Sequence, residues 1–513
     1  MKKRTTNKTL VTIGVMLGLL FASLDQTIVS TALPTITSEL GGLAFYSWVV
    51  AIYMLAESIG IPIFGKLSDL YDRKKIYLIG MGFFLVGSIL CGLAQDITLL
   101  IIARGIQGIG AGALLPLAFI MIADIYPVEQ RAKIQGVLGS MFMISSILGP
   151  AIGGFLTENL SWHWIFFINI PIALLAAVFI WVGYQEGAEK QQPTIDWWGA
   201  ITLSLGIVAI LMTTILTGGE GGHSASHTWG SPLVLTLLIG GILLLALFIW
   251  IERKTKDPIL PIYLFKNRVT SILSVVSFFM GLGMFGAISF LPLYLQNVKQ
   301  LSATASGYML LPMMIGAMGA GIIGGFILLK FKYRNLLVTS LLIMIGGFLM
   351  LSRVSADTSL WYFGISAGII GLGMGVLMPA LTTLTQELVP KKDIGAATAS
   401  VNLFRSLGAT IGISILGGVL NSQVADDVQS TIRDNPIFAN VLSQNIQDAL
   451  RNPEGMSAEA YNQLLTIFIN GLHTLFLLSA SLIAVAVIVS LFIGNGKLSS
   501  NTNKNSTSNQ SYH

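Results

Sequence analysis

Apolar segments of about 20 residues recur along the whole chain, separated by short polar connections. A helix of this length crosses roughly 30 Å of hydrocarbon. The pattern predicts an all-α polytopic membrane protein with about fourteen spans. The expected spans are 10–32, 46–66, 75–95, 98–122, 133–156, 163–183, 197–217, 231–251, 268–292, 305–329, 335–353, 360–385, 396–420 and 465–494.

Composition supports a membrane protein. Of the 513 residues, 54% are hydrophobic and 10% are charged, and the mean hydropathy is +0.77, whereas a soluble domain is about a quarter charged. The first apolar run continues past Asp25 to Leu33 without a cleavage pattern, which indicates an uncleaved span. The single cysteine, Cys91, excludes an internal disulfide and a thiolate metal cluster, so we expect no metal or cofactor.

The location of the basic residues explains the high pI, about 9.1. If the amino terminus is cytoplasmic, most of the 29 Lys and Arg residues fall in cytoplasmic segments. This asymmetry is the positive-inside rule, and it requires no nucleic-acid partner. An even number of spans then places both termini in the cytoplasm.

Three ionisable side chains lie at membrane depth in the amino-terminal part: Asp25, Glu57 and Arg104. Charges inside spans are costly and mark functional sites by default. Asp25 and Arg104 lie at similar depths and can pair, whereas Glu57 lies nearer the midplane. The alternative is structural, with Asp25 and Arg104 as a permanent buried pair.

Two motifs in successive spans carry a family resemblance. Arg-x-x-Gln-Gly-x-Gly begins at Arg104, and Gly-Pro-x-x-Gly-Gly comprises Gly149, Pro150, Gly153 and Gly154. They resemble the fourth- and fifth-helix signatures of the major facilitator superfamily, and the second resembles its proton-coupled antiporters in particular. The resemblance implies two six-helix bundles that rock against each other.

Further motifs resemble the fourteen-helix drug:proton antiporters, which insert two helices between the bundles. The implied organisation is a first bundle at 1–190, an inserted pair at 191–255, a second bundle at 256–498 with an external loop at 421–463, and a disordered tail at 499–513. The motifs are Leu24-Asp25-Gln26-Thr27, Asp196-Trp197-Trp198-Gly199, Asp257-Pro258-Ile259-Leu260-Pro261, Leu291-Pro292-Leu293-Tyr294 and Arg405-x-x-Gly408.

The turn between the second and third spans resembles the superfamily's cytoplasmic latch, in which an acid and basic residues hold the two halves together. The latch residues by this resemblance are Gly65, Asp69, Arg73 and Lys74. Asp72 stands where the family normally has Gly, so the geometry of the turn is an open question.

Substrate contacts are expected in the spans. Glu57 is the candidate for a cationic drug, and Trp48, Tyr53, Phe285, Tyr294 and Met374 can line a cavity or serve as packing residues. Gly60–Lys66 imitates a phosphate loop, but Leu67 stands where a Ser or Thr would bind magnesium. We therefore expect no ATP hydrolysis and no enzyme.

The function that fits best is proton-coupled efflux of amphipathic, often cationic compounds, with Asp25 carrying the proton. The resemblance places this monomeric antiporter in a bacterial cytoplasmic membrane, where its partners are drugs, protons and the lipid bilayer. Alternatives are proton-coupled uptake of a polar solute and a membrane receptor or lipid-handling enzyme, for which we find no nucleophile constellation.

Two packing expectations complete the prediction. We expect the glycines of the fifth span to contact the start of the carboxy-terminal half, where Gly316, Ala320 and Gly324 form one smooth helix face. We also expect the inserted pair to be peripheral to the transport pathway, because it carries no charge at mid-depth.

Overall fold

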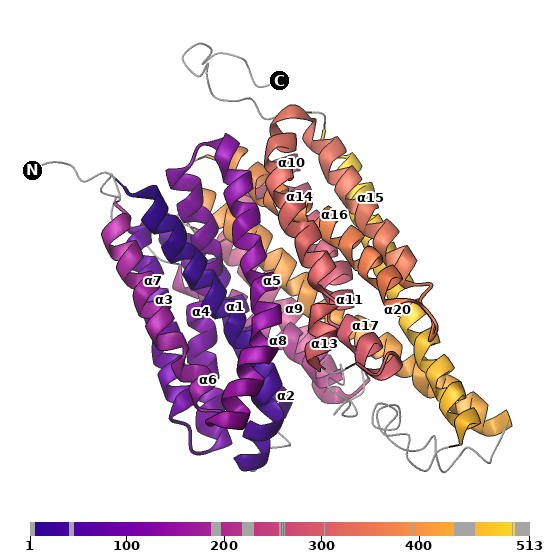
Figure 1. Cartoon of the computed structure of the whole chain (residues 1–513). Coiled ribbons are helices and arrows are strands. Elements are labelled where there is room, and N and C mark those ends of the chain that lie inside the picture. Colours follow the sequence, from indigo (N-terminus) through magenta and orange to yellow (C-terminus); the bar gives the residue numbers. More distant parts are fainter. Residues whose placement is uncertain are drawn as a thin grey trace, which may run out of the picture.

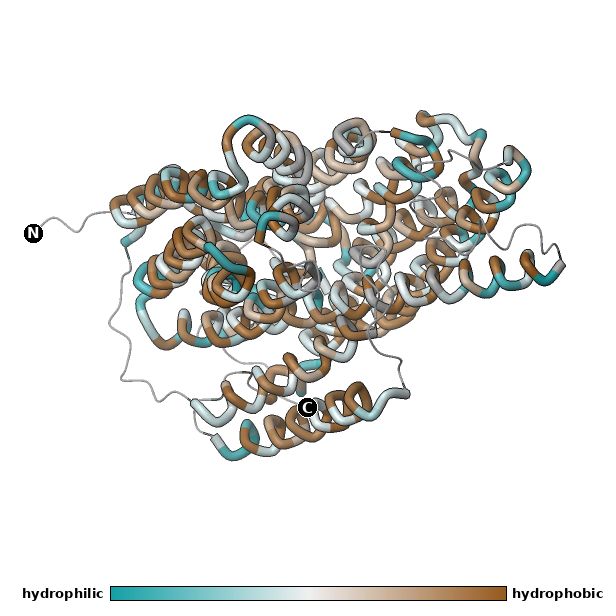
Figure 2. The backbone as a smooth tube through the Cα atoms, turned by 90° about the horizontal axis from the view of Figure 1, so that it is seen from below, coloured by the Kyte–Doolittle hydropathy of each residue, from teal (hydrophilic) through white to brown (hydrophobic). Residues whose placement is uncertain are grey.

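Every regular element that the computed structural model describes is a helix (Figure 1). Hydrophobic residues occupy most of each helix, and hydrophilic residues gather at the helix ends (Figure 2). The described residues are 6–40, 46–185, 196–217, 230–255, 258, 260, 262–301, 303–390, 393–434, 457–494 and 496–497. The predicted tail at 499–513 lies outside them.

The amino-terminal part forms one bundle. Its apolar cores draw their buried side chains from residues 11–184. Polar side chains start the helices where the apolar runs begin, as when Asn7 and Asp96 accept backbone N–H groups of the first turn. The helices are α1 (Lys8–Glu39), α2 (Tyr46–Leu70), α3 (Arg73–Gly92), α4 (Ile97–Ile125), α5 (Val128–Asn159), α6 (Trp164–Phe167) and α7 (Asn169–Gly183).

The carboxy-terminal part forms a second bundle, whose apolar core lies within residues 272–493. Its first elements are η3 (Ile262–Lys266), α10 (Arg268–Met280), η4 (Gly281–Phe285), α11 (Gly286–Ile288), α12 (Leu291–Leu293) and η5 (Tyr294–Val298). The remaining ones are α13 (Ala303–Tyr308), α14 (Leu311–Lys330), α15 (Tyr333–Leu351), α16 (Leu360–Glu387), α17 (Ile394–Asp434) and α20 (Ala458–Leu491).

Between the bundles in sequence lie α8 (Trp197–Thr217) and α9 (Pro232–Glu252), which pack on each other. A separate apolar cluster joins α8 to α2 and α17; it includes Leu55, Leu203 and Leu403. Most residues of α9 are not buried against protein, as a helix facing lipid requires.

Within the described residues, 11 helices are long and apolar enough to cross a membrane, and two shorter apolar helices add to them. The predicted all-α membrane class is confirmed, whereas the count of fourteen stays a prediction. The expected span 268–292 is not one continuous α-helix. It changes to π-helical geometry at Gly281 and is interrupted before Pro292, because glycine permits close backbone packing and proline removes a helix hydrogen bond.

The polar stretch expected as a loop from 421 is partly helical. α17 continues to Asp434 because Val424 and Val428 are buried, and Gly471 of α20 lets those helices meet at Leu420 and Val424. At about 60 Å, α17 is twice the thickness of the hydrocarbon. The centre of the stretch, 435–456, lies outside the described residues.

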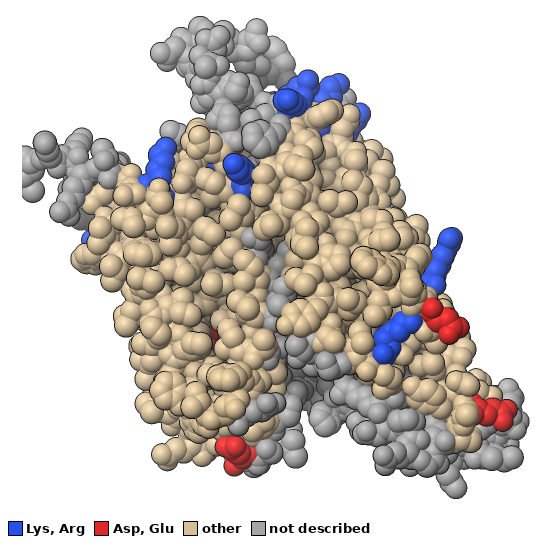
Figure 3. All heavy atoms as spheres, in the orientation of Figure 1, with Lys and Arg blue, Asp and Glu red and all other residues tan. Residues whose placement is uncertain are grey.

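The two ends of the bundle differ in charge. We call the end that holds the start of α1, the α2–α3 turn and the end of α20 the latch end. On the face shown in Figure 3, several Lys and Arg side chains gather there, whereas acidic side chains are visible farther down, some of them with basic side chains beside them. The distribution is the one expected from the positive-inside rule.

Candidate functional site

A buried ion pair lies in the core of the amino-terminal bundle. Arg104 on α4 places Nη1 2.5 Å from Oδ2 of Asp25 on α1. Their side chains are 2% and 0% exposed, so water does not compete for the contact. Because α1 and α4 are 79 positions apart at this contact, only the fold brings the two charges together.

Neutral amides complete the hydrogen bonds of Asp25. Its Oδ1 accepts from Gln107 Nε2 at 2.8 Å and from Asn169 Nδ2 at 2.9 Å, and Asn169 also donates to Ser88. Every partner of the carboxylate is a donor, which is the pattern that stabilises the charged form. Protonating Asp25 therefore requires at least one of these bonds to be rearranged. Gln107 and Asn169 were not among the predicted partners of Asp25, although Gln107 belongs to the Arg104 motif.

Tyr53 supports the arginine rather than facing a cavity. The Arg104 guanidinium lies 4.2 Å from the centre of the Tyr53 ring, a cation–π contact. Tyr53 is 1% exposed, and its hydroxyl reaches the Ala22 carbonyl at 3.5 Å. Nε of Arg104 has no hydrogen-bond partner among the described residues. Tyr53, which was predicted to contact substrate, thus packs against the ion pair in this structure.

Glu57 is separate from this pair, and its carboxylate has fewer hydrogen-bond partners than that of Asp25. It is half-buried on α2, and its Oε2 accepts one hydrogen bond, from Gln26 Nε2 at 3.0 Å. Gln26 follows Asp25 directly in α1, so one helix carries both the first acid and the amide that binds the second. A movement of α1 would alter both contacts together.

Arg405 on α17 is a buried cation that faces the amino-terminal bundle. It donates from Nη2 to Oδ1 of Asn402 at 2.7 Å, and no carboxylate of the described residues lies within ion-pair distance. Beside it, the Ser406 hydroxyl lies 3.4 Å from that of Ser58 on α2. Arg405 was predicted only as part of a motif, although its position inside an apolar span is the same signal that marked Arg104.

The latch end joins the two bundles through Asp69. Its carboxylate accepts the backbone N–H groups of Gly395 at 2.9 Å and Ala396 at 2.7 Å, at the start of α17. A helix amino terminus attracts negative charge, so this contact is favourable. Gly65 packs directly against Ala399, where any side chain would collide. Both residues thus contact the first turns of α17, and their role as a latch stays a prediction.

A second acid near the start of α17 fixes the segment that follows the inserted pair. The Tyr263 hydroxyl in η3 donates to Oδ1 of Asp393 at 2.6 Å. Burial and the neighbouring carboxylate raise the pKa of Tyr263, so its hydroxyl keeps its proton and continues to donate.

The basic latch residues act within the amino-terminal bundle. Arg73 pairs with Asp124 and lies 3.6 Å from Asp69, which it orients. Lys74 does not join the bundles: its Nζ donates to the Tyr184 carbonyl at 3.2 Å and lies over the Trp181 ring. This corrects its assignment to the latch, because its side chain points toward the end of α7.

Asp72 resolves the question of the turn geometry. It is the N-cap of α3, and its carboxylate accepts the backbone N–H groups of Lys74 and Lys75 at 2.8 and 3.2 Å. An aspartate suits this position because the first N–H groups of a helix have no partner within it.

A buried amide network joins the bundles deeper in the molecule. Gln135 on α5 donates to Gln386 on α16 at 3.1 Å and accepts from Thr383 at 2.9 Å. Gln386 in turn donates to the Phe119 carbonyl and to Thr398 on α17. An ion pair between Arg131 and Glu387 lies beside the network. Four helices, two from each bundle, meet here, and no local sequence pattern predicts this network.

The antiporter-motif glycines pack differently from the expectation. Gly149 meets Thr27 and Gly153 meets Ile28, both on α1 of the same bundle, and a Cβ at Gly154 would meet nothing within 4 Å. Gly136, which lies nearer the start of α5, packs instead against Gly321 of α14 in the other bundle. Gly316 and Gly324 face α16, which corrects the predicted packing partner.

The remaining substrate candidates occupy different surroundings. Tyr294 is 0% exposed in the carboxy-terminal core, stacks on Phe363 and donates to the Ser355 carbonyl, so it lines no cavity in this structure. Met374 borders a pocket of about 20 Å³ between α5, α14 and α16, too small for a drug. Trp48 is half-buried on α2. The side chains of Phe285 and Pro150 lie outside the described part of the chain.

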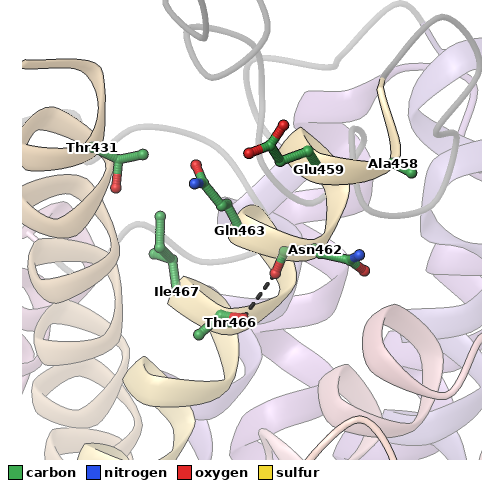
Figure 4. Close-up of a pocket in the computed structure, with 7 residues that line it drawn as sticks. All are labelled: Thr431, Ala458, Glu459, Asn462, Gln463, Thr466 and Ile467. Carbon is green, nitrogen blue, oxygen red and sulfur yellow. Dashed lines mark hydrogen bonds between the residues drawn. The ribbon is translucent and has the colours of Figure 1, made fainter. Parts of the chain in front are cut away.

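A polar pocket lies far from these charges, between the extensions of α17 and α20 (Figure 4). Its cavity volume is about 670 Å³. The lining residues are Thr431, Ala458, Glu459, Asn462, Gln463, Thr466 and Ile467. Neither here nor in the rest of the described chain are three or more His, Cys, Asp or Glu residues arranged to hold a metal ion.

Comparison with known proteins agrees with this architecture. The model of the Major Facilitator Superfamily matches residues 15–413. The chain belongs to this family, and it is therefore a multi-span membrane transporter rather than an enzyme.

Curated relatives resemble the chain over nearly its full length. Multidrug transporter protein MdtP of Bacillus subtilis is 37% identical, covering 97% of this chain and 95% of its own. Multidrug resistance protein 3 of the same organism is also 37% identical, with 95% of each chain covered. Among solved structures, the proton:xylose symporter XylE matches with a TM-score of 0.60 at 16% identity, covering 95% of this chain and 96% of its own. At that identity, the match shows the fold alone.

Proposed function

We propose that the protein exports amphipathic, often cationic compounds in exchange for protons, by alternating movement of its two bundles. The names of its Bacillus subtilis relatives support multidrug efflux. The observation that carries the coupling is the buried Asp25–Arg104 pair. Burying an ionised carboxylate costs desolvation free energy, and ionisable residues inside a membrane span usually have a function.

Asp25 carries the proton in this proposal. While Arg104, Gln107 and Asn169 donate to it, the carboxylate is stable as an anion. A movement of α1 that withdraws the guanidinium leaves an uncompensated charge in apolar surroundings, which then takes up a proton. Proton binding is thereby tied to the position of one helix.

Glu57 is the proposed contact for cations. It is more accessible than Asp25 and has a single amide partner, so a positively charged amphiphile can approach it at lower desolvation cost. Gln26 links this contact to α1, so binding at Glu57 shifts the helix that carries Asp25. A cation and a proton then compete for one conformational change, and the proton gradient drives export.

The latch end faces the cytoplasm in this scheme, with both termini on that side of the bacterial plasma membrane, and the monomer is the working unit. Inward opening must separate Asp69 from the start of α17 and break the amide network around Gln135 and Gln386. Both contacts are polar, so water can replace them when the end opens.

Proton release on substrate addition tests the proposal. In everted vesicles energised to an acidic interior, tetraphenylphosphonium added outside should release stored protons, as read by a pH-sensitive dye. A symporter working by uptake would not exchange protons for substrate in this direction. Absence of release from wild-type vesicles, with an intact gradient, would reject the antiport proposal.

A further inference from the structure

Arg405 differs from three other described arginines that lie at contacts between helices. Arg73, Arg104 and Arg131 each pair with a carboxylate. Arg405 is 9% exposed, and among the described residues it makes only the bond to Asn402. A buried guanidinium carries five donors and a full charge, so leaving it without an acid is unfavourable. Its retention in an apolar span points to a ligand.

The surroundings hold Arg405 in a fixed orientation. Asn402 donates from Nδ2 to the Thr398 carbonyl at 3.0 Å, which directs its Oδ1 toward the guanidinium. Gly281 of η4 packs directly on the backbone carbonyl of Arg405, where a side chain would collide. The guanidinium is therefore a preorganised donor, with the remaining N–H groups free of protein acceptors in the described part of the chain.

Glu57 and Arg405 lie on α2 and α17, which meet at the boundary between the bundles. The Ser58–Ser406 contact brings together the positions that directly follow them on α2 and α17. The same two helices share an apolar cluster that includes Leu55 and Leu403, so this boundary is closely packed. Glu57 and Arg405 are nevertheless not within the 4.0 Å of an ion pair, so the opposite charges lie on adjoining helices without direct contact.

We propose that Arg405 is the anion-recognising group of the substrate site, opposite Glu57, so that the pump accepts zwitterionic amphiphiles carrying both an ammonium-type cation and a carboxylate. The inference rests on the proposed efflux function and adds a substrate class to it. A zwitterion satisfies both charges at once, with its cation at Glu57 and its carboxylate on the guanidinium, which matches carboxylate geometry. A substrate that carries only a positive charge leaves the Arg405 guanidinium without an anionic partner.

A matched pair of fluorescent probes tests this. Tetramethylrhodamine carries a carboxylate beside its cationic ring system, and its methyl ester lacks only that negative charge. We expect wild-type protein in everted vesicles to transport both. Arg405→Gln should reduce transport of the free acid by about tenfold or more, since hydrogen bonds to charged groups are the strong ones, and change transport of the ester less than about twofold.

Two further variants keep the test interpretable. Arg405→Lys retains the charge and should preserve part of the free-acid transport, and Arg353→Gln removes an exposed arginine and should change neither probe. If Arg405→Gln fails to insert, the ratio of free-acid to ester transport in Arg405→Lys decides, because loss of the bidentate fork should lower that ratio.

The outcomes separate the two proposals. Wild-type protein that exports the ester but not the free acid, or an Arg405→Gln variant that loses both probes equally, would overturn the role of Arg405 and leave efflux standing. Wild-type protein that exports neither probe in a gradient-dependent way would instead count against the efflux function.

Discussion

The two bundles share a helical architecture but bury different chemistry. The amino-terminal core contains Asp25 and Arg104, with amides arranged around them. The carboxy-terminal core buries mostly hydroxyls that bond to their own helix, such as Ser340, Ser366 and Ser479. Its buried charges among the described residues, Asp393 and Arg405, lie on α17 or its approach and face the boundary. In the proposed mechanism, the amino-terminal bundle therefore handles the proton, and the carboxy-terminal bundle supplies the surface that moves against it.

The largest effect should come from the charge in the amino-terminal core. Asp25→Asn keeps the shape of the side chain but leaves Arg104 without its counter-charge, a loss of about 3–5 kcal/mol for a buried pair. We expect gradient-driven export of every substrate to fall by a factor on the order of 100. Substrate-induced proton release from purified protein measures this, with Asp96→Asn, an exposed helix cap, as the control. Undiminished release would remove Asp25 as the proton carrier.

The contact between the bundles at the latch end is next in size. Asp69→Asn weakens two charge-assisted bonds to the start of α17, worth about 1–2 kcal/mol at a helix terminus. Hydrogen–deuterium exchange in the first turns of α17 should accelerate roughly tenfold. Asp72→Asn is the matched control, since Asp72 caps α3 within one bundle. Equal acceleration in both variants would show that the latch does not depend on Asp69.

Glu57 should affect one class of substrate only. Glu57→Gln removes the negative charge but keeps the hydrogen-bonding shape, so export of monocations should fall by roughly fivefold to tenfold. Neutral amphiphiles should be exported at the wild-type rate. Susceptibility of a pump-deficient host to paired cationic and neutral compounds gives the readout. A parallel loss for both classes would mean that Glu57 does not distinguish charge.

The amide network should show coupling between the bundles. Gln135→Leu leaves Gln386 Oε1 and Thr383 without partners in a dry contact, which should reduce export about fivefold by disturbing closure, at about 1 kcal/mol per lost bond. In the double variant Gln135→Leu/Gln386→Leu, two apolar side chains replace the amide pair. The loss of export should then be smaller than the sum of the two single losses, although Thr383 and Thr398 still lose a partner. Strict additivity of the two single effects would show that the amides do not act as a pair.

The smallest effect is expected at the inserted pair. Ile242 on α9 is 55% exposed and faces lipid, so Ile242→Ala should change export by less than about twofold. A cysteine at this position should be labelled equally with and without substrate. Substrate protection would place α9 in the pathway and contradict its peripheral role.

The class of fold and the chemistry available to it follow from local sequence patterns. A bilayer admits long apolar helices, and charges within them are rare, so the all-α membrane class and the candidate residues Asp25, Glu57 and Arg104 could be predicted in this way. The motif around Arg104 and the antiporter motif led directly to the family, which the comparisons confirmed. Asp69 and Gly65 were likewise predicted from their motif, and their role as a latch stays a prediction.

Which face each helix presents to which neighbour depends on the tertiary structure. Successive residues of a helix differ in direction by about 100°. On α14, Gly321 therefore meets Gly136 of the other bundle, whereas the predicted face with Gly316 and Gly324 meets α16 of its own bundle. The Gln135–Gln386 network joins residues 251 positions apart and leaves no periodic trace in either helix. The placement of Glu57 and Arg405 on adjoining helices has the same origin, because it depends on how two whole bundles dock.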